Sequence, residues 1–283
     1  MKATLPKIKF CGFTRPEDIQ AALDLGIRSI GINFYPKSKR YVQPSVAVRL
    51  LEPFIATRPL LASSTEVSGS SSKRFPTPRF PTPRFIGVFV DATPEEVLGT
   101  VRLCSLDGIQ LHGDEDPSWI DSARRLAGWI DVPILRALPY RGSIDDALIQ
   151  EWSSLVCSDS SPVSGLLIDA YDPIHKGGTG KRVAWELLTP RPASFLPRVV
   201  ADVPMGSDGS VVDGLGVPFL LAGGLNPENV KDAMKLVMPL GVDVASGIES
   251  EPGIKDLGKM KSFIQSYREG LAGQKTPMQG EQS

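Results

Sequence analysis

The sequence predicts one α/β domain in which eight parallel strands and their helices close into a (β/α)8 barrel. The chain has 283 residues, and a barrel of this type usually takes about 250 as a single domain. It also contains eight short apolar runs, separated by amphipathic segments of helical length. Strands that alternate regularly with helices favour parallel pairing through right-handed crossovers, and eight such units close into a barrel.

The predicted strands are taken from the apolar runs in chain order. They are 7–12, 29–34, 85–91, 108–112, 133–137, 165–170, 219–222 and 242–245. Threonine and glutamate three residues apart, with a proline between them, predict capping boxes at 14–17 and 93–96. Asn226 is a third predicted helix N-cap, and Gly26 is expected to end the first helix in a left-handed conformation.

Two segments interrupt this alternation. The stretch 62–83 is rich in serine and proline with a tandem Arg-Phe-Pro-Thr-Pro repeat, and 201–216 is rich in glycine and aspartate. We expect both to be disordered insertions in αβ loops, which lie on the barrel face opposite the usual site of catalysis. The barrel is predicted over 1–270, followed by a flexible tail at 271–283.

Composition excludes several classes of function. A formal net charge of -1, from 31 basic and 32 acidic residues, gives no attraction to nucleic acid or to an anionic membrane. Cys11, Cys104 and Cys157 are too few and too widely spaced for a disulfide framework or a zinc site, and two histidines cannot build a His-based metal cluster. Without a membrane-length apolar run or a signal-peptide region, the chain is expected to be cytoplasmic. Its oligomeric state is left open.

Polar side chains are predicted to converge on one mouth of the barrel. Side chains alternate across a strand, so Lys9 and Cys11 should both point inward, where the ammonium lowers the thiol pKa and favours the thiolate. An inert buried cysteine is the alternative. The same alternation places a further set inward at strand ends: Asn33, Asp91, Gln110, His112, Arg136 and Asp169.

Roles follow from residue type and position. Asp169 is the favoured acid, with Asp172 in the following loop as the alternative, and His112 is expected to bond a substrate rather than the core. Arg40, in a lysine-rich loop, is either a carboxylate or phosphate clamp or part of a solvated charge run. Glycine-rich loops after the last three strands are expected to bind phosphate through backbone amides. Their candidate residues are Gly178, Gly180, Gly223, Gly224, Ser246 and Gly247.

Several motifs together resemble one known family. They are KFCG at 9–12, FYPKSKRY at 34–41, QLHG at 110–113, GGTGK at 177–181, GGLNPENV at 223–230 and DVASG at 243–247. In collinear order, from about residue 7 to 264, they are similar to phosphoribosylanthranilate isomerase of tryptophan biosynthesis, a TIM-barrel enzyme. Phe10 and Phe13 depart from the smaller aliphatic residues usual beside the cysteine.

The resemblance implies an Amadori rearrangement of a small phosphorylated substrate, N-(5-phosphoribosyl)anthranilate, without a metal or cofactor. It assigns Asp169 as general acid and Cys11 as general base, Arg40 to the anthranilate carboxylate, and the loops at Gly224 and 246–247 to the phosphate. A slightly longer loop after Asp169 keeps Asp172 open as the acid. The alternatives are another phosphosugar barrel isomerase or synthase, and a non-catalytic phosphate-binding barrel.

Overall fold

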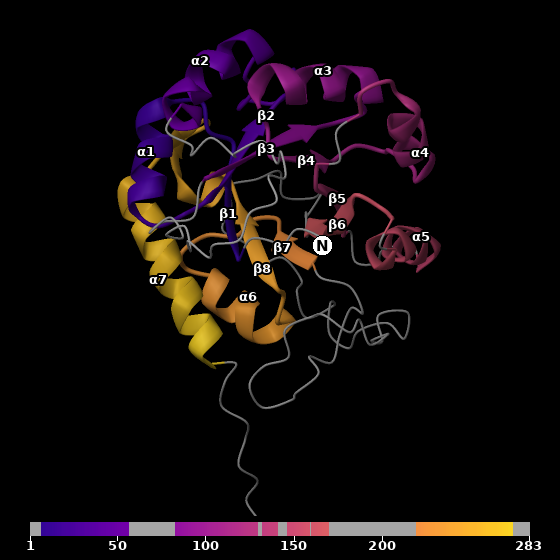
Figure 1. The fold of residues 1–283 in the computed structure, drawn as a ribbon. Helices are drawn as coiled ribbons and strands as arrows, with labels where there is room; N and C mark the ends of the chain where they lie inside the picture. Colours follow the sequence, from indigo (N-terminus) through magenta and orange to yellow (C-terminus); the bar gives the residue numbers. More distant parts are fainter. Residues whose placement is uncertain are drawn as a thin grey trace, which may run out of the picture.

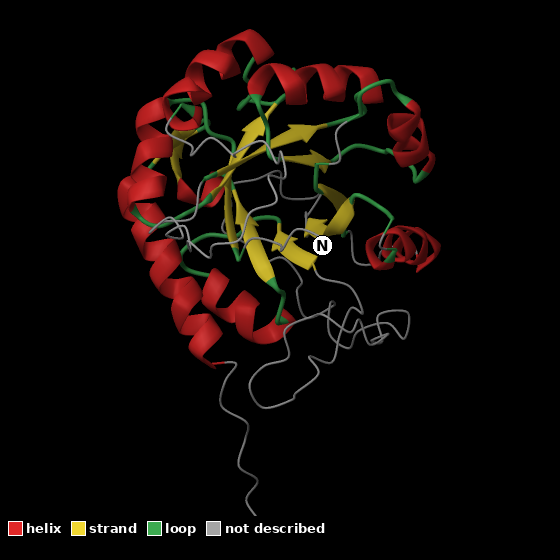
Figure 2. Ribbon diagram, in the orientation of Figure 1, coloured by secondary structure: helices red, strands yellow, loops and turns green. Residues whose placement is uncertain are grey.

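The computed structural model describes residues 7–56, 83–129, 132–140, 146–158, 160–169 and 219–273. Within them, eight parallel strands form a closed barrel in sequence order, and helices surround the strands (Figures 1 and 2). The predicted (β/α)8 barrel is therefore confirmed. The barrel strands are β1 (Ile8–Cys11), β2 (Ser29–Asn33), β3 (Arg84–Phe89), β4 (Gly108–Leu111), β5 (Ile134–Pro139), β6 (Val163–Asp169), β7 (Phe219–Ala222) and β8 (Gly241–Val244).

The helices follow the strands along the chain. They are α1 (Pro16–Asp24), α2 (Pro44–Ile55), α3 (Pro94–Cys104), α4 (Ser118–Arg125), α5 (Asp146–Cys157), α6 (Val230–Val237) and α7 (Leu257–Gly273). A short 3-10 helix, η3 (Ser246–Ile248), follows β8 and leads into a hairpin of β9 (Glu249–Glu251) and β10 (Ile254–Lys255). This hairpin lies between the last barrel strand and α7, beyond the last strand predicted from the sequence.

Some helix ends are determined by local capping interactions, and others by contacts with distant parts of the chain. The capping box at 93–96 is confirmed, since the Thr93 side chain accepts from the Glu96 amide. The box at 14–17 is wrong: α1 starts without a side-chain cap, and the Thr14 hydroxyl instead donates to the Gly253 carbonyl of the hairpin at 2.7 Å. The predicted N-cap at Asn226 is wrong by three residues: the N-cap of α6 is Asn229, whose amide donates to the Asn226 side chain in the preceding turn. Gly26 has the predicted positive φ, +88°.

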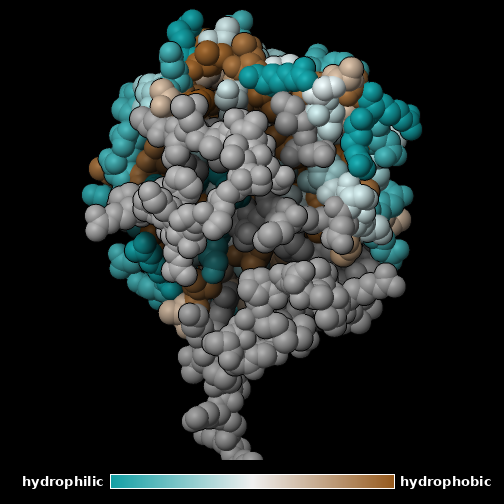
Figure 3. Space-filling view, viewed as in Figure 1, coloured by the Kyte–Doolittle hydropathy of each residue, from teal (hydrophilic) through white to brown (hydrophobic). Residues whose placement is uncertain are grey.

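The core has two layers. One lies between strands and helices and contains fully buried residues such as Phe10, whose ring meets that of Phe263 edge-on at 5.9 Å. The other fills the barrel interior and is formed by Leu135, Ala137, Leu167, Leu220 and Ala222. The outer surface of the helices is largely hydrophilic, with apolar side chains showing between them (Figure 3). Strands β5, β6 and β7 thus pack apolar side chains on both of their faces, as parallel barrels require.

The predicted insertions fall mostly outside the described residues. All of 201–216 lies outside them, and so does all of 62–83 except Pro83, which precedes β3. The first insertion connects α2 to β3, so it is an αβ connection as expected. Helix α7 continues to Gly273 and therefore includes 271–273, which the sequence analysis assigns to the tail. The described part of the chain contains no helix with an apolar stretch of membrane-spanning length.

Candidate functional site at the carboxyl ends of the barrel strands

Strand β1 carries the two inward groups that its alternation predicts. Lys9 is fully buried and Cys11 is 8% exposed, while Phe10 between them packs against the helices. Gly31 of β2 provides the space for both groups. A Cβ at this position would lie 2.7 Å from Cys11 Sγ and 3.1 Å from Lys9 Nζ. The inward orientation of Lys9 and Cys11 is confirmed.

The charge of Lys9 is balanced by a residue that the sequence analysis did not single out. Its Nζ donates to Asp243 Oδ1 of β8 at 2.9 Å, in an ion pair shielded from solvent. Burial lowers the pKa of Lys9, but Asp243 and Cys11 together raise it by more, and the net shift is upward. Asp243 lies on the inward positions of β8, between Val242 and Val244, so strand alternation could have identified it.

Burial has the largest influence on the Cys11 thiol. It raises the pKa, and the lowering by Lys9 and Lys255 does not cancel it, partly because Asp243 opposes them. The net shift is upward from the usual value of 9.0. The predicted influence of Lys9 has the correct sign, but the expected net lowering is wrong. A buried thiolate loses hydration. Lys9, whose positive charge is already balanced by Asp243, compensates for only part of that loss.

Strands β4 and β6 bring a histidine and a carboxyl group together. The amide nitrogen of Gln110 lies 2.9 Å from His112 Nδ1, and His112 Nε2 lies 3.0 Å from Asp169 Oδ2. Because the amide nitrogen only donates, Nδ1 accepts and Nε2 donates to the carboxylate. Both ring nitrogens are therefore engaged. In this arrangement His112 has no free ring nitrogen for the predicted bond to a substrate. The ring instead orients Asp169.

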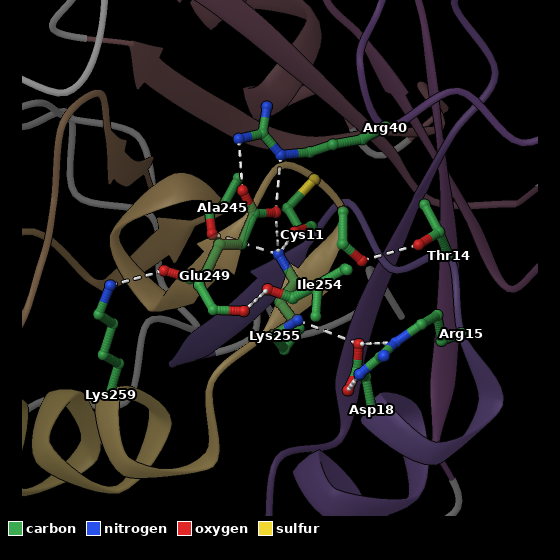
Figure 4. A network of polar contacts seen from close by, with 12 residues as sticks. Cys11, Thr14, Arg15, Asp18, Arg40, Ala245, Glu249, Ile254, Lys255 and Lys259 are labelled. Carbon is green, nitrogen blue, oxygen red and sulfur yellow. Dashed lines mark hydrogen bonds and ion pairs between the residues drawn. The ribbon is translucent and has the colours of Figure 1, made fainter.

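Arg40 reaches the same mouth from the loop after β2. Its Nε and Nη2 donate to Glu249 at 2.7 and 2.6 Å, and the side chain is 22% exposed. It is therefore not a freely solvated charge. Figure 4 shows the guanidinium above Cys11, with Glu249 beside it. Glu249 stays ionised because Arg40 and Lys255 together outweigh the effect of burial and lower its pKa.

Arg136 was predicted to point inward, and this is wrong. Its neighbour Leu135 belongs to the barrel interior, while the Arg136 guanidinium lies 5.1 Å from the Trp152 ring in the helical layer. It pairs with Glu115 at 2.7 Å and donates to the Gly113 carbonyl at 2.9 Å. Leucine is compatible with either face of a barrel strand, so polarity alone did not identify the inward positions.

Two other predicted strand-end residues lie at the rim. Asp91 is exposed with a φ of 53°, and its carboxylate accepts from the Asp114 amide at 2.7 Å. It follows the end of β3 and does not point into the barrel, so its predicted inward position is wrong. The side-chain oxygen of Asn33 accepts from the Tyr35 amide at 2.9 Å, which stabilises the turn after β2.

The loops after β7 and β8 pack directly against each other. Gly223 and Gly224 have φ values of +90° and +62°, which expose successive backbone amides. A side chain at Gly247 would overlap the Leu225 carbonyl, so this position must be glycine for the loops to touch. Ser246 is exposed beside it. Gly178, Gly180 and Asp172 lie outside the described residues.

The remaining cysteines lie away from this mouth. Cys104 ends α3, its sulfur is 3.4 Å from the Pro44 carbonyl, and burial raises its pKa to about 11. Cys157 ends α5 and is exposed. Within the described residues, no three metal-ligating side chains lie together as a cluster.

The sequence is similar to one family of enzymes over nearly its full length. A family model described as N-(5'phosphoribosyl)anthranilate (PRA) isomerase matches residues 57–266. The N-(5'-phosphoribosyl)anthranilate isomerase of Myxococcus xanthus is 35% identical over 265 residues, which cover 93% of this chain and 96% of that protein. The enzyme of Thiobacillus denitrificans is 35% identical over 261 residues, with 91% and 96% covered.

Solved structures agree with the sequence comparison. Phosphoribosyl anthranilate isomerase from Thermotoga maritima superposes with a TM-score of 0.63 at 27% identity, over 93% of this chain and 99% of that one. A structure of this isomerase with reduced 1-(o-carboxyphenylamino)-1-deoxyribulose 5-phosphate gives 0.60 at 25%, over 93% and 99%. A 3-hexulose-6-phosphate synthase, at 13% identity and 0.53 over 92% and 99%, shares the fold alone.

Proposed function

The chain belongs to the N-(5'-phosphoribosyl)anthranilate isomerase family, and from this premise we propose a role for each residue of the site. It is an aldose-ketose isomerase of tryptophan biosynthesis. The reaction is the Amadori rearrangement of N-(5-phosphoribosyl)anthranilate to 1-(o-carboxyphenylamino)-1-deoxyribulose 5-phosphate. Hydrogen moves from C2 to C1 within one molecule, so proton transfers suffice and no cofactor is needed.

Asp169 is proposed as the general acid. His112 donates to its Oδ2, which leaves Oδ1 as the oxygen that carries a proton toward the substrate. Protonation of the ribose ring oxygen breaks its bond to C1 and gives an open-chain protonated Schiff base. A carboxyl group held in one orientation needs no search at the moment of transfer, which lowers the barrier.

Cys11 is proposed as the general base. As thiolate it removes the C2 proton of the Schiff base, and the resulting enolamine tautomerises to the ketone. Lys9 and Lys255 lower the thiol pKa, so both stabilise the thiolate that burial disfavours. The observation that carries this assignment is the arrangement at the mouth, where the inward Cys11 of β1 shares the strand-end face with the His112–Asp169 pair.

The two ends of the substrate are held by different chemistry. The phosphate is proposed to bind the backbone amides of Gly223, Gly224 and 246–247, with Gly178 and Gly180 completing the site. Positive φ at the first two glycines and contact between the two loops support this. The anthranilate carboxylate is proposed to bind Arg40, which is charge-complementary. We also propose that the enzyme is cytoplasmic, where free cysteines stay reduced.

The experiment compares Cys11→Ser and Asp169→Asn with Cys157→Ser, a matched control at an exposed cysteine outside the site. Turnover is followed by fluorescence on freshly prepared phosphoribosylanthranilate. Each site variant is expected to lose on the order of 10² to 10⁴ in kcat while the control keeps it. Circular dichroism checks that all three proteins are folded. Normal turnover in either folded site variant would refute its role, and a non-catalytic barrel would show no turnover even in the unaltered protein.

A further inference from the structure

The side-on edge of Arg40, formed by Nε and Nη2, binds the carboxylate of Glu249. Nε and Nη2 donate to the two oxygens of Glu249 at 2.7 and 2.6 Å (Figure 4). A guanidinium has five N–H donors, and this bidentate pair uses one from Nε and one from Nη2. Of the three donors left over, one on Nη1 and one on Nη2 form the end-on edge.

Glu249 is itself fixed from the opposite side. Lys255 Nζ lies 2.8 Å from Glu249 Oε1, and the two side chains are 0% and 4% exposed. The same Nζ donates to the carbonyls of Cys11 at 2.6 Å and Ala245 at 3.2 Å. Lys255 therefore joins the carboxylate to the ends of β1 and β8. An ion pair held by this many hydrogen bonds in a buried position has little freedom to reorient.

The stem of Arg40 is confined as well. Gly12 has a φ of +78°, and a side chain at this position would overlap Arg40 Cδ. The arginine stem thus crosses directly over the backbone next to Cys11, with Glu249 at the side of its guanidinium. The contact with Gly12 and the ion pair with Glu249, from separate segments of the chain, together determine the plane of the guanidinium group.

The combined charge of Arg40, Glu249 and Lys255 is complementary to an anion. Arg40 and Lys255 contribute two positive charges and Glu249 one negative charge, so one positive charge is left over. A preorganised arginine loses less conformational freedom on binding than a free one, so its hydrogen bonds contribute more to affinity.

We propose that Glu249, held by Lys255, is a positioning residue that fixes the guanidinium plane so that Arg40 meets the substrate carboxylate through its end-on edge. Glu249 does not touch the substrate in this scheme. The inference rests on the proposed role of Arg40. It adds the β9–β10 hairpin to the part of the site that recognises the anthranilate carboxylate.

The test measures binding of two ligands by calorimetry. One is 1-(o-carboxyphenylamino)-1-deoxyribulose 5-phosphate, and the other is 1-phenylamino-1-deoxyribulose 5-phosphate, which lacks only the carboxylate. Glu249→Gln keeps the side-chain shape but turns an amide donor toward the guanidinium donors. It should weaken the first ligand about tenfold, roughly the worth of one charged hydrogen bond, and leave the second unchanged.

The control is Lys259→Ala. Lys259 Nζ donates to the backbone carbonyl of Glu249 at 2.6 Å, so this variant disturbs the same hairpin without altering the carboxylate. It should keep the unaltered preference for the carboxylate ligand. Equal weakening of both ligands in Glu249→Gln, or no weakening of either, would overturn the positioning role.

Two further variants keep the result interpretable. If Glu249→Gln does not fold, Glu249→Asp keeps the charge, and its loss should again be confined to the carboxylate ligand; an equal loss for both would count against the proposal. Arg40→Lys tests the premise separately. If Arg40→Lys keeps the preference, Arg40 does not bind the carboxylate, whereas loss of preference in Arg40→Lys alone would defeat only the role of Glu249.

Discussion

His112 Nε2 lies 3.0 Å from Asp169 Oδ2, so the end of β4 holds the carboxyl group that ends β6. The two strands are not neighbours, since β5 lies between them. The ring is in turn fixed by Gln110, two residues earlier on the same face of β4. Both partners are partly exposed, at 32% and 24% of their side-chain surface, as a proton-transfer group at an open mouth must be.

Replacing this histidine should lower the rate more than the affinity. In His112→Asn the shorter side chain cannot bridge Gln110 and Asp169, so the carboxyl group loses its orientation. Misplacement of a catalytic group by about 1 Å can cost roughly 10²-fold, so we expect kcat to fall about tenfold to a hundredfold with little change in KM. Steady-state kinetics test this. A large rise in KM at unchanged kcat would instead indicate that His112 binds the substrate directly.

The reactivity of Cys11 should reveal its raised pKa. Only the thiolate is alkylated, so the rate of iodoacetamide labelling at Cys11 rises with pH and should have its midpoint above the usual 9.0. Peptide mass spectrometry in a Cys157→Ser background separates this site from the exposed cysteine. A midpoint below 9.0 would contradict the dominance of burial.

The ion pair beside the thiol should move that midpoint in both directions. Lys9→Met removes a cation that lowers the Cys11 pKa and leaves Asp243, which raises it, so the labelling midpoint should move to higher pH. Asp243→Asn removes the opposing anion and should move it to lower pH. The two variants are matched controls for each other, because a general loosening of the barrel would shift both in the same direction.

Arg136 should contribute to stability through its buried partner. Arg136→Met leaves the Glu115 carboxylate, 3% exposed, without its guanidinium. Removal of one member of a buried pair typically costs about 3–5 kcal/mol of unfolding free energy. Urea denaturation measures this loss. The double variant Arg136→Met with Glu115→Gln should recover part of it, since no uncompensated charge remains; a double variant as unstable as the single one would contradict this explanation.

The insertion at 62–83 should be dispensable for catalysis. It connects α2, which ends at Ile55, to the start of β3 at Arg84, whereas the proposed catalytic groups lie at the carboxyl ends of the strands. Deletion should leave kcat nearly unchanged, measured with the same fluorescence assay. A variant of equal length with the segment replaced by a glycine-serine linker controls for strain at the junction. A large loss of kcat in both would place the segment near the active site.

Strand alternation predicted the site where the neighbouring residues were unambiguous. In β1 and β4 the outward positions carry Phe10, Ile109 and Leu111, so the polar residues between them had to face inward. It failed in β5, because the barrel interior there is itself apolar and Leu135 fits either face. Arg136 faces outward because it pairs there with Glu115. Glu115 lies in the loop after β4 and meets Arg136 only in the folded barrel.

The sequence by itself determined the barrel, the order of its strands, the inward Lys9 and Cys11, and the family, since each depends on local periodicity or on motifs of fixed spacing. The tertiary structure alone decided how the charges pair. Asp243 with Lys9, His112 with Asp169, and Glu249 with both Arg40 and Lys255 join segments that can be more than 200 residues apart. The physical reason is that an ion pair depends on distance in space, and barrel closure brings the first and last strands together.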